Sequence, residues 1–330
     1  MKILIPGGSG QVGHILARYF HVRGHAVTVL SRNPRPAPWR VVLWDGATPG
    51  PWTKELAESD VCINLAGRSV DCRYNAANRR AIYDSRIEST RLLNQVVSSI
   101  NPAPKLWINA STATIYRHAL DRAMDESTGE LGGNEPNAPD TWRFSIDVAK
   151  GWEAAFFSTP TPLTRKVAIR SALTLGPDRG GVFDRFVALV RFGLGGRQGD
   201  GTQFVSWIHE ADFTRAIELL IEREDFSGVV NLASPQPLPN RDFMRVLREA
   251  WGAGFGLSIP AWLMEIGAFF MRTESELVLK SRRVVPGRLL DAGFRFGFPE
   301  WPVAAKDLVA RWRASGGIRS GKGATPPRPN

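Results

Sequence analysis

The chain has little cysteine, little histidine and no long hydrophobic run, and each shortage excludes a class of protein. Its two cysteines, Cys62 and Cys72, cannot build a disulfide framework, so we expect a reducing compartment. No stretch of about 18 apolar residues is present, which argues against a membrane-spanning helix. The first residues, MKILIPGGSG, lack the apolar length and the small-residue cleavage site of a signal peptide. These absences predict a cytoplasmic protein with no membrane contact.

The five histidines are scattered along the chain, and their spacing does not favour a metal site. The one close pair, His21 and His25, straddles Gly24, which is expected to end a helix. We therefore expect no bound metal ion.

The formal net charge of +10 is concentrated near one end of the chain. Residues 271–330 hold twelve Lys and Arg against five Asp and Glu, so +7 of the total lies there. No RNA- or DNA-binding motif accompanies these charges, so we expect no nucleic-acid partner. The last fifteen residues, 316–330, are rich in Gly and Pro and predict a flexible tail.

Strand-like apolar runs alternate with helical segments through most of the chain. Runs such as KILIP, AVTVLSR, VCINLAG and KLWINAST are followed by segments such as RLLNQVVSSI, whose apolar residues share one helical face. This alternation predicts an α/β fold with a Rossmann-type, doubly wound parallel sheet. From about residue 235, helical patches and proline-containing loops predict a smaller C-terminal lobe on the substrate side. The expected boundaries are 1–234 for the Rossmann domain, with a substrate-side loop insertion at 179–210, and 235–315 for the lobe.

Three glycines, Gly7, Gly10 and Gly13, lie between the first predicted strand and the first predicted helix. A dinucleotide pyrophosphate needs such a turn, because it approaches the backbone closely and faces a helix N-terminus with positive partial charge. The spacing within this strand-turn-helix predicts a nucleotide site. The same turn is expected to bring three further residues to the cofactor: Ser9, Gln11 and Val12.

The end of the second predicted strand indicates which nicotinamide cofactor the site takes. NAD sites carry an acidic residue there, which accepts hydrogen bonds from the ribose 2′-hydroxyl. This chain has Ser31 and Arg32 instead, and a guanidinium matches the charge and shape of a 2′-phosphate. NADP is therefore favoured over NAD. The NLAG segment ends a later strand, and its small residues are expected beside the adenosine part of the cofactor: Leu65, Ala66 and Gly67.

Six segments within residues 1–312 match one known group of proteins: ILIPGGSGQVG, INLAG, SRIESTRLL, GLGGRQGDGTQFVSWIHEADF, VVNLASPQPLPNRDF and RRVVPGRLLDAGFRF. On these segments the chain resembles the extended and atypical short-chain dehydrogenases/reductases. Within them it resembles an epimerase-like family with a C-terminal domain of unknown function. The resemblance implies a nicotinamide dinucleotide, and the extended relatives suggest a homodimer. Two residues depart from the family pattern, Pro6 before the first glycine and Arg117 after Tyr116.

The resemblance also implies a catalytic arrangement. Short-chain dehydrogenases hold the substrate oxygen with a Ser or Thr at the end of the fifth strand. A Tyr, four residues before a Lys on the next helix, moves the proton. In NASTATIYRH the match places Thr112 at the Ser/Thr position, with Ser111 as the alternative and as a cofactor contact. Polar residues that only cap the sheet are the other interpretation.

The Tyr and Lys of this dyad are absent. In FSIDVAKGWE, Ser145 falls at the Tyr position and Ala149 at the Lys position, while Lys150 lies about 100° further round the helix. The chain's four tyrosines, at 19, 74, 83 and 116, are followed four residues later by Arg, Asn, Ile and Leu. No Tyr-x-x-x-Lys therefore exists, and Tyr116 and Ser145 are the candidates for proton transfer.

Three hypotheses follow. The one we favour is an NADP-dependent oxidoreductase or epimerase-like enzyme that acts on a small polar, by preference anionic, substrate through Thr112 and a different acid-base group. The second is a sensor that binds NADPH without turnover, and the third is an interaction protein that uses the basic C-terminal end. Other residues have both a substrate-side and a structural interpretation: Arg170, Trp207, His209, Arg282, Arg283 and Arg288.

Overall fold

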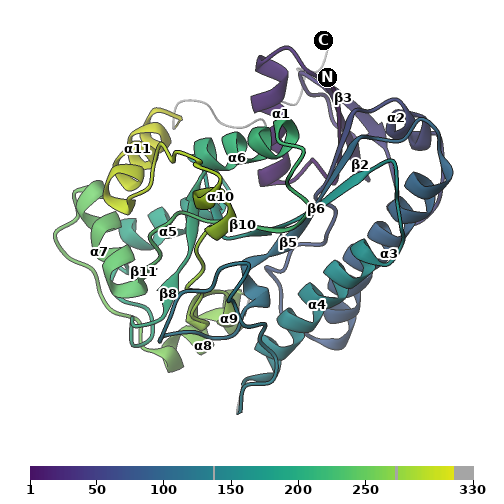
Figure 1. The fold of residues 1–330 in the computed structure, drawn as a ribbon. Coiled ribbons are helices and arrows are strands. Elements are labelled where there is room, and N and C mark those ends of the chain that lie inside the picture. Colours follow the sequence, from purple (N-terminus) through teal and green to yellow (C-terminus); the bar gives the residue numbers. More distant parts are fainter. Residues whose placement is uncertain (137, 272–273, 316–330) are drawn as a thin grey trace, which may run out of the picture.

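The centre of the molecule is a parallel sheet of seven strands (Figure 1). The computed structural model describes residues 1–136, 138–271 and 274–315, so the tail predicted at 316–330 lies outside the described residues. The strand order is β10-β6-β5-β4-β1-β2-β3, and every neighbouring pair is parallel. The strands are β1 (Lys2–Pro6), β2 (Ala26–Ser31), β3 (Arg40–Leu43), β4 (Val61–Asn64), β5 (Leu106–Thr112), β6 (Arg165–Ser171) and β10 (Gly228–Leu232). The predicted α/β class and parallel sheet are confirmed.

Helices cover both faces of this sheet (Figure 1). One face packs against α1 (Gln11–Val22) and α6 (Glu210–Glu222), and the other against α2 (Trp52–Ala57), α3 (Ala76–Ser99) and α4 (Asp140–Phe157). Helix α1 ends before Gly24, whose φ of 80° fits the predicted helix stop. None of the helices in the described ranges is long and apolar enough to cross a membrane.

The two-residue period of a strand explains the two layers of core. In β1, Ile3 and Ile5 pack in the cluster that holds Phe20 of α1 and Ile217 of α6, whereas Leu4 between them packs in the cluster that holds Leu93 of α3. Alternate side chains of a strand point to opposite faces of the sheet, so continuous apolar runs such as KILIP are those of a sheet buried on both sides.

A second core lies beside the sheet, under helices from the later part of the chain. It is built from α5 (Val182–Arg191), α7 (Asn240–Trp251) and α11 (Trp301–Ala314), together with the short strands β7 (Leu173–Leu175) and β9 (Trp207–His209). Trp301 stacks on Phe243 at 4.2 Å between ring centroids. The remaining elements are η1 (Ala113–Ile115), β8 (Phe204–Val205), β11 (Leu238–Pro239), α8 (Ala261–Met271), α9 (Glu276–Leu279) and α10 (Gly287–Asp291).

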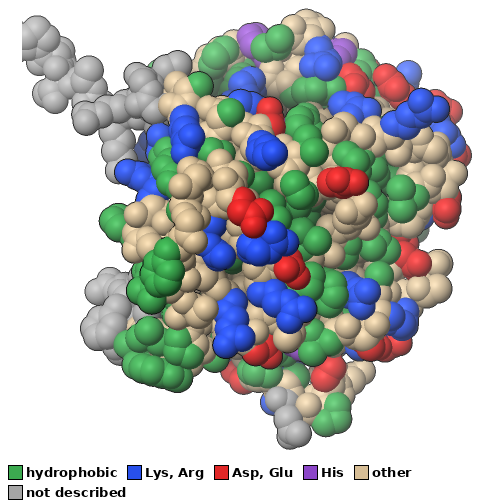
Figure 2. Space-filling view, turned by 90° about the vertical axis from the view of Figure 1, so that its left-hand side faces the viewer, with side chains coloured by type: hydrophobic (Ala, Val, Ile, Leu, Met, Phe, Trp, Pro, Cys, Tyr) green, Lys and Arg blue, Asp and Glu red, His purple; other side chains and the backbone are tan. Residues whose placement is uncertain are grey.

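The second core draws on residues from both sides of position 234, and the domain boundary predicted there stays a prediction. The segment predicted as a loop insertion, 179–210, contains α5, β8 and β9. On the face of the molecule that Figure 2 draws, Lys and Arg side chains are interspersed with Asp and Glu. Two arginines of α11 have partners nearby. Arg311 pairs with Glu210 and Asp307, and Arg313 donates to the carbonyl of Trp251.

The strand order reverses at β1, which has β2 on one side and β4 on the other. In open α/β sheets, ligands bind at the carboxyl ends of the strands where the order reverses. The chain therefore places the glycine turn that follows β1 and the NLAG residues that follow β4 at the same edge of the sheet.

Candidate active site

The glycine turn after β1 is closely packed against the segment after β4. Gly7 has a φ of +72°, and a Cβ on it would lie 2.6 Å from the backbone of Ala66. A Cβ on Gly13 would lie 2.4 Å from the backbone of Gly8, so the start of α1 needs glycine to pack on the turn. By contrast, a Cβ on Gly10 would meet only the Gly7 carbonyl, at 4.0 Å. The turn is thus tight on its inner side and open on its outer side.

The N-terminus of α1 is free of side-chain caps and of acidic residues in its first turn. Unpaired amides at the start of a twelve-residue helix carry positive partial charge and suit an anionic ligand. Gln11 points its Oε1 to the backbone N–H of Val182 at 3.3 Å, while its buried Nε2 has no hydrogen-bond partner among the described residues. An unpaired buried donor next to uncapped helix amides fits a phosphate ligand, which can accept hydrogen bonds from both.

The predicted cofactor-selecting residues lie at the end of β2. Ser31 is buried, and its Oγ accepts a hydrogen bond from the backbone N–H of Asn33 at 3.2 Å. Arg32 is exposed, and its guanidinium makes no hydrogen bond or ion pair within the described residues. Ser9 is exposed on the turn, Val12 is half-buried, and Leu65 donates its N–H to the carbonyl of Pro6 at 2.8 Å.

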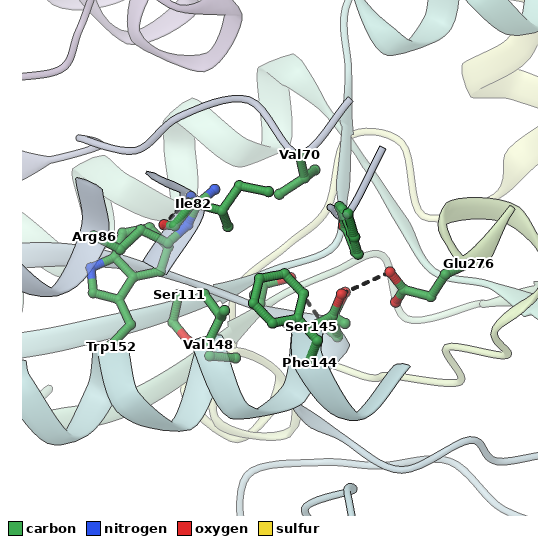
Figure 3. A pocket seen from close by; sticks show the side chains of 13 residues that line it. Val70, Ile82, Arg86, Ser111, Phe144, Ser145, Val148, Trp152 and Glu276 are labelled. Atoms are coloured by element: carbon green, nitrogen blue, oxygen red, sulfur yellow. Dashed lines mark hydrogen bonds between the residues drawn. The ribbon is translucent and has the colours of Figure 1, made fainter. Parts of the chain in front are cut away.

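A pocket of about 260 Å³ opens at the carboxyl end of β5, alongside α4. Figure 3 shows Phe144, Ser145, Val148 and Trp152 projecting into it from α4, with Glu276 opposite Ser145. Its lining is Val70, Tyr74, Ile82, Arg86, Ser111, Thr112, Thr114, Phe144, Ser145, Val148, Ala149, Trp152 and Glu276. Three predicted residues, Ser111, Thr112 and Ser145, are therefore brought together.

The two hydroxyls at the end of β5 differ in what their protons do. The Ser111 Oγ donates to Glu153 Oε1 at 2.6 Å, so its proton is engaged. The Thr112 Oγ1 accepts from the N–H of Thr114 at 3.2 Å and donates to no acceptor within the described ranges. Thr112 therefore keeps a proton that can bind a substrate oxygen, which favours it over Ser111 for that role.

Ser145 is connected to a buried charged pair. Its Oγ donates to Glu276 Oε2 at 2.8 Å, and the other oxygen of Glu276 pairs with Arg282 Nη2 at 3.0 Å. Glu276 lies 131 residues after Ser145 in the chain, and only 1% of it is exposed. The serine at the motif's tyrosine position is thus held by a carboxylate from the C-terminal region.

The lysine position of the missing dyad carries no charge, because Ala149 occupies it. Ala149 is buried at the pocket wall. Lys150 points elsewhere, because its Nζ donates to the carbonyl of Gly132 at 2.6 Å. One residue along an α-helix corresponds to a rotation of about 100°, so the Lys150 side chain leaves the helix in a different direction from that of Ala149.

Tyr116 does not line the pocket. Its hydroxyl donates to Asn231 Oδ1 at 2.9 Å and accepts from Arg170 Nη1 at 3.0 Å, and only 2% of the residue is exposed. Arg170 also forms a double hydrogen bond with Glu153, at 2.8 and 2.7 Å. Burial raises the pKa of Tyr116 above its ordinary value. Of its two interpretations, Arg170 takes the structural one, and the catalytic role predicted for Tyr116 stays a prediction that this placement does not favour.

The other residues with two interpretations lie in structural contacts. Trp207 is buried in the second core, and His209 caps α6, contacts Asp307 at 3.0 Å and stacks on Phe298. Neither lines the pocket. The arginines of the C-terminal region bind main-chain carbonyls or carboxylates: Arg282 with Glu276, Arg283 with Leu120 and Asp121, and Arg288 with Ser227 and Val229.

Several pocket residues were not foreseen from the sequence, among them Arg86, Tyr74 and Glu276. Arg86 projects from α3 and lies over the Trp152 ring at 5.1 Å (Figure 3). A Cβ on Gly67 would lie 3.1 Å from its guanidinium carbon, so Arg86 adjoins the NLAG segment. It pairs with no carboxylate in the part of the chain that is described, and burial lowers its pKa to about 10. Its Nη1 donates to the carbonyls of Arg68 and Ile82, so at neutral pH the pocket wall carries a positive charge that is bound to main-chain oxygens. The only sequence signal for Arg86 was its place in the matching segment SRIESTRLL.

Comparisons with known proteins agree with this arrangement. Residues 3–139 match the NAD dependent epimerase/dehydratase family, and residues 259–308 match a domain of unknown function (DUF1731). The chain is 32% identical to the epimerase family protein SDR39U1 of Bos taurus, over 94% of this chain and all of that protein. It is 29% identical to the epimerase family protein YfhF of Bacillus subtilis, over 94% of this chain and 98% of that one.

Solved structures give the same result. A crystal structure of human epimerase family protein SDR39U1 with NADPH superposes with a TM-score of 0.80 at 30% identity, covering 94% of this chain and 99% of that one. A UDP-N-acetylglucosamine 4-epimerase from Bacillus cereus, at 16% identity and a TM-score of 0.71 over 95% and 99% of the two chains, shares the fold. The resemblance inferred from the sequence is confirmed: the chain belongs to the NAD dependent epimerase/dehydratase family, among the epimerase family proteins represented by SDR39U1.

Proposed function

We propose that the protein binds NADPH at the edge of the sheet where β1 meets β4, and that it is an oxidoreductase or epimerase-like enzyme acting on a small polar substrate in the pocket beside α4. The observation that carries the proposal is the Thr112 hydroxyl, whose proton meets no acceptor among the described residues, in a pocket that adjoins the nucleotide-binding edge. The human SDR39U1 crystal structure with NADPH supports the choice of cofactor.

The residues present suit this cofactor. The uncapped start of α1 and the glycine turn would hold the pyrophosphate, and Ala66 and Gly67 leave room for the nucleoside. Arg32 would take the 2′-phosphate, since its guanidinium is exposed and has no partner in the described part of the chain. When bound, the cofactor supplies or accepts a hydride.

The pocket suits a small substrate with at least one oxygen. Its volume of about 260 Å³ lies just below the usual range for ligand sites. Thr112 would donate a hydrogen bond to the substrate oxygen, and Arg86 favours a ligand with negative charge, because its own charge has no carboxylate partner in the described ranges. Val148 and Phe144 would exclude water from the reacting atoms.

A second function, a sensor that binds NADPH without turnover, is favoured by one specific observation. Ala149 occupies the lysine position and Lys150 is engaged by Gly132, so the usual lysine is missing from the pocket. The two functions differ in one measurable respect, the consumption of NADPH.

The experiment that tests the proposal combines binding and turnover. NADPH and NADH are titrated by fluorescence, and NADPH absorbance is then followed with glyoxylate, diacetyl, glyceraldehyde and phenanthrenequinone. We expect NADPH to bind more tightly than NADH and at least one carbonyl compound to be reduced. Thr112→Val should lower kcat/KM about 100-fold or more, while Thr112→Ser should retain most of it. Failure to bind either dinucleotide would refute the proposal, and binding without consumption would favour the sensor.

A further inference from the structure

One tyrosine lines the pocket, although the sequence motif that would place one there is absent. Tyr74, on the loop before α3, forms part of the pocket wall. The other three lie elsewhere: Tyr19 donates to Glu218 at 2.6 Å, Tyr83 is 38% exposed on α3, and Tyr116 is bound to Asn231. We propose that Tyr74 is the proton donor of this pocket. This inference rests on the proposed function and names its acid-base group.

Tyr74 is fixed in place by contacts on its backbone and on its ring. Its N–H donates to Glu274 Oε1 at 2.6 Å, and its carbonyl accepts from Arg79 Nε at 2.7 Å. Its ring meets that of Phe144 edge-on, with 5.1 Å between centroids, and only 7% of the residue is exposed. A donor held from several sides loses little conformational entropy when it acts, which is the condition for an efficient proton transfer.

Tyr74 lines the same pocket as the residue that replaces the motif tyrosine. Ser145 stands at that position on α4 and lowers the pKa of the Tyr74 phenol. Ser145 in turn is held by Glu276 at 2.8 Å. A phenol therefore lines the pocket from the loop before α3, and Ser145 serves as its positioning residue.

Arg86 supplies the positive charge that the motif lysine would otherwise give. It projects into the same pocket from α3, twelve positions after Tyr74 in the sequence, and the Tyr74 phenolate would raise its pKa. Because this attraction is mutual, Arg86 stabilises the phenolate that forms when Tyr74 gives up its proton. Arg282, paired with Glu276 behind Ser145, acts in the same sense.

The proton step can be written with a full balance. The carbonyl carbon gains a hydride, and the carbonyl oxygen takes the proton of Tyr74 as the O–H bond of the phenol breaks. The phenolate then regains a proton from water. The sum is one carbonyl compound, one NADPH and one proton converted into one alcohol and one NADP⁺. The hydroxyl of Thr112 keeps the carbonyl oxygen oriented by its own hydrogen bond.

Burial and the nearby carboxylate of Glu276 raise the pKa of Tyr74 to about 12, while Ser145 and Arg282 lower it only partly. At neutral pH Tyr74 is therefore a phenol, with a proton to give to the carbonyl oxygen.

The test compares Tyr74→Phe with Tyr83→Phe, which removes the same hydroxyl from an exposed residue. NADPH affinity is measured by fluorescence and NADPH consumption with the four carbonyl compounds named above. The Tyr74 Cζ resonance is followed by NMR on protein labelled with ¹³C-tyrosine and assigned by its loss in Tyr74→Phe. We expect Tyr74→Phe to lower kcat about 100-fold or more with NADPH affinity unchanged, and Tyr83→Phe to match the wild type. The Tyr74 resonance should stay that of a phenol up to pH 10.

Ser145→Ala provides a second variant that keeps the tyrosine. It should shift the onset of Tyr74 ionisation to higher pH and lower kcat less than Tyr74→Phe does. If wild-type enzyme reduces a carbonyl and Tyr74→Phe reduces it equally well, the role of Tyr74 is wrong while the proposed function survives. If the wild type binds NADPH and reduces none of the four compounds, both are overturned.

Discussion

Replacing Arg32 by Glu should reverse the cofactor preference of the protein. The guanidinium of Arg32 is exposed, follows β2 directly and has no partner to lose among the described residues, so the change leaves the folded protein's own contacts intact. Its expected role is a charge-assisted hydrogen bond to the 2′-phosphate of NADPH. NADH, which has a hydroxyl there, does not depend on that bond.

The magnitude follows from the strength of one such bond. Loss of a hydrogen bond to a charged group costs about 1.5–3 kcal/mol, which corresponds to an increase of about 10- to 150-fold in the Kd for NADPH. A glutamate adds repulsion toward the phosphate, so we expect the upper part of this range. The Kd for NADH should change by less than about threefold or fall, because a carboxylate can accept from the ribose 2′-hydroxyl.

The assay is a fluorescence titration of wild type, Arg32→Glu and Arg35→Glu with both dinucleotides, at about 0.05 and 0.5 M salt. Arg35→Glu makes the same charge change three residues further on in an exposed position, and so controls for the general field of the surface. Higher salt should weaken NADPH binding to the wild type more than to Arg32→Glu. Equal losses for NADPH and NADH, or an equal loss in Arg35→Glu, would refute the assignment of the 2′-phosphate to Arg32.

Three further predictions concern packing and charge. Gly13→Ala places a methyl group 2.4 Å from the Gly8 backbone, so NADPH binding and the Tm should both fall, whereas Gly254→Ala, with open space around it, should change neither. Tyr116→Phe removes the buried hydroxyl that bonds Arg170 Nη1 and Asn231 Oδ1, and should lower the free energy of unfolding in urea by about 1–3 kcal/mol with NADPH affinity unchanged; unaltered stability would contradict the network. Burial lowers the pKa of Lys280 to about 7 from its ordinary 10.5, so the folded state binds fewer protons than the unfolded state between these pH values and stability rises with pH. From pH 7.5 to 9.0 the wild type should gain on the order of 2 kcal/mol more than Lys280→Met, and equal gains would argue against a neutral buried lysine.

Local sequence determined the features that depend on neighbouring residues. The Gly7, Gly10 and Gly13 spacing predicted the turn between β1 and α1, where Gly7 has a φ of +72° and a Cβ on Gly13 would lie 2.4 Å from the Gly8 backbone. The apolar runs of β1 and β4 indicated a sheet covered on both faces. The absence of a Tyr-x-x-x-Lys motif could also be read directly from the sequence. The identity and order of these local signals sufficed for the fold class and the nucleotide-binding edge.

The sequence could not decide what each polar residue faces. Trp207 and His209, in a segment that resembles a substrate border, are buried in structural contacts. Arg170 had equal claims as a substrate contact and as an ion pair until Glu153, from α4, proved to be its partner. Tyr116 follows the right strand, but its hydroxyl is turned to Asn231 of β10.

Only the tertiary structure assembled the pocket. Tyr74, Arg86, Thr112, Ser145 and Glu276 come from separate elements spread over two hundred positions of the chain, and no local pattern links them. They meet because β5 carries Thr112 to the sheet edge, α3 and α4 pack side by side, and the C-terminal region returns a buried glutamate to Ser145. The conformation of a backbone turn depends on residues that are adjacent in the sequence. A site built from side chains depends on packing between elements, and that packing exists only in the folded chain.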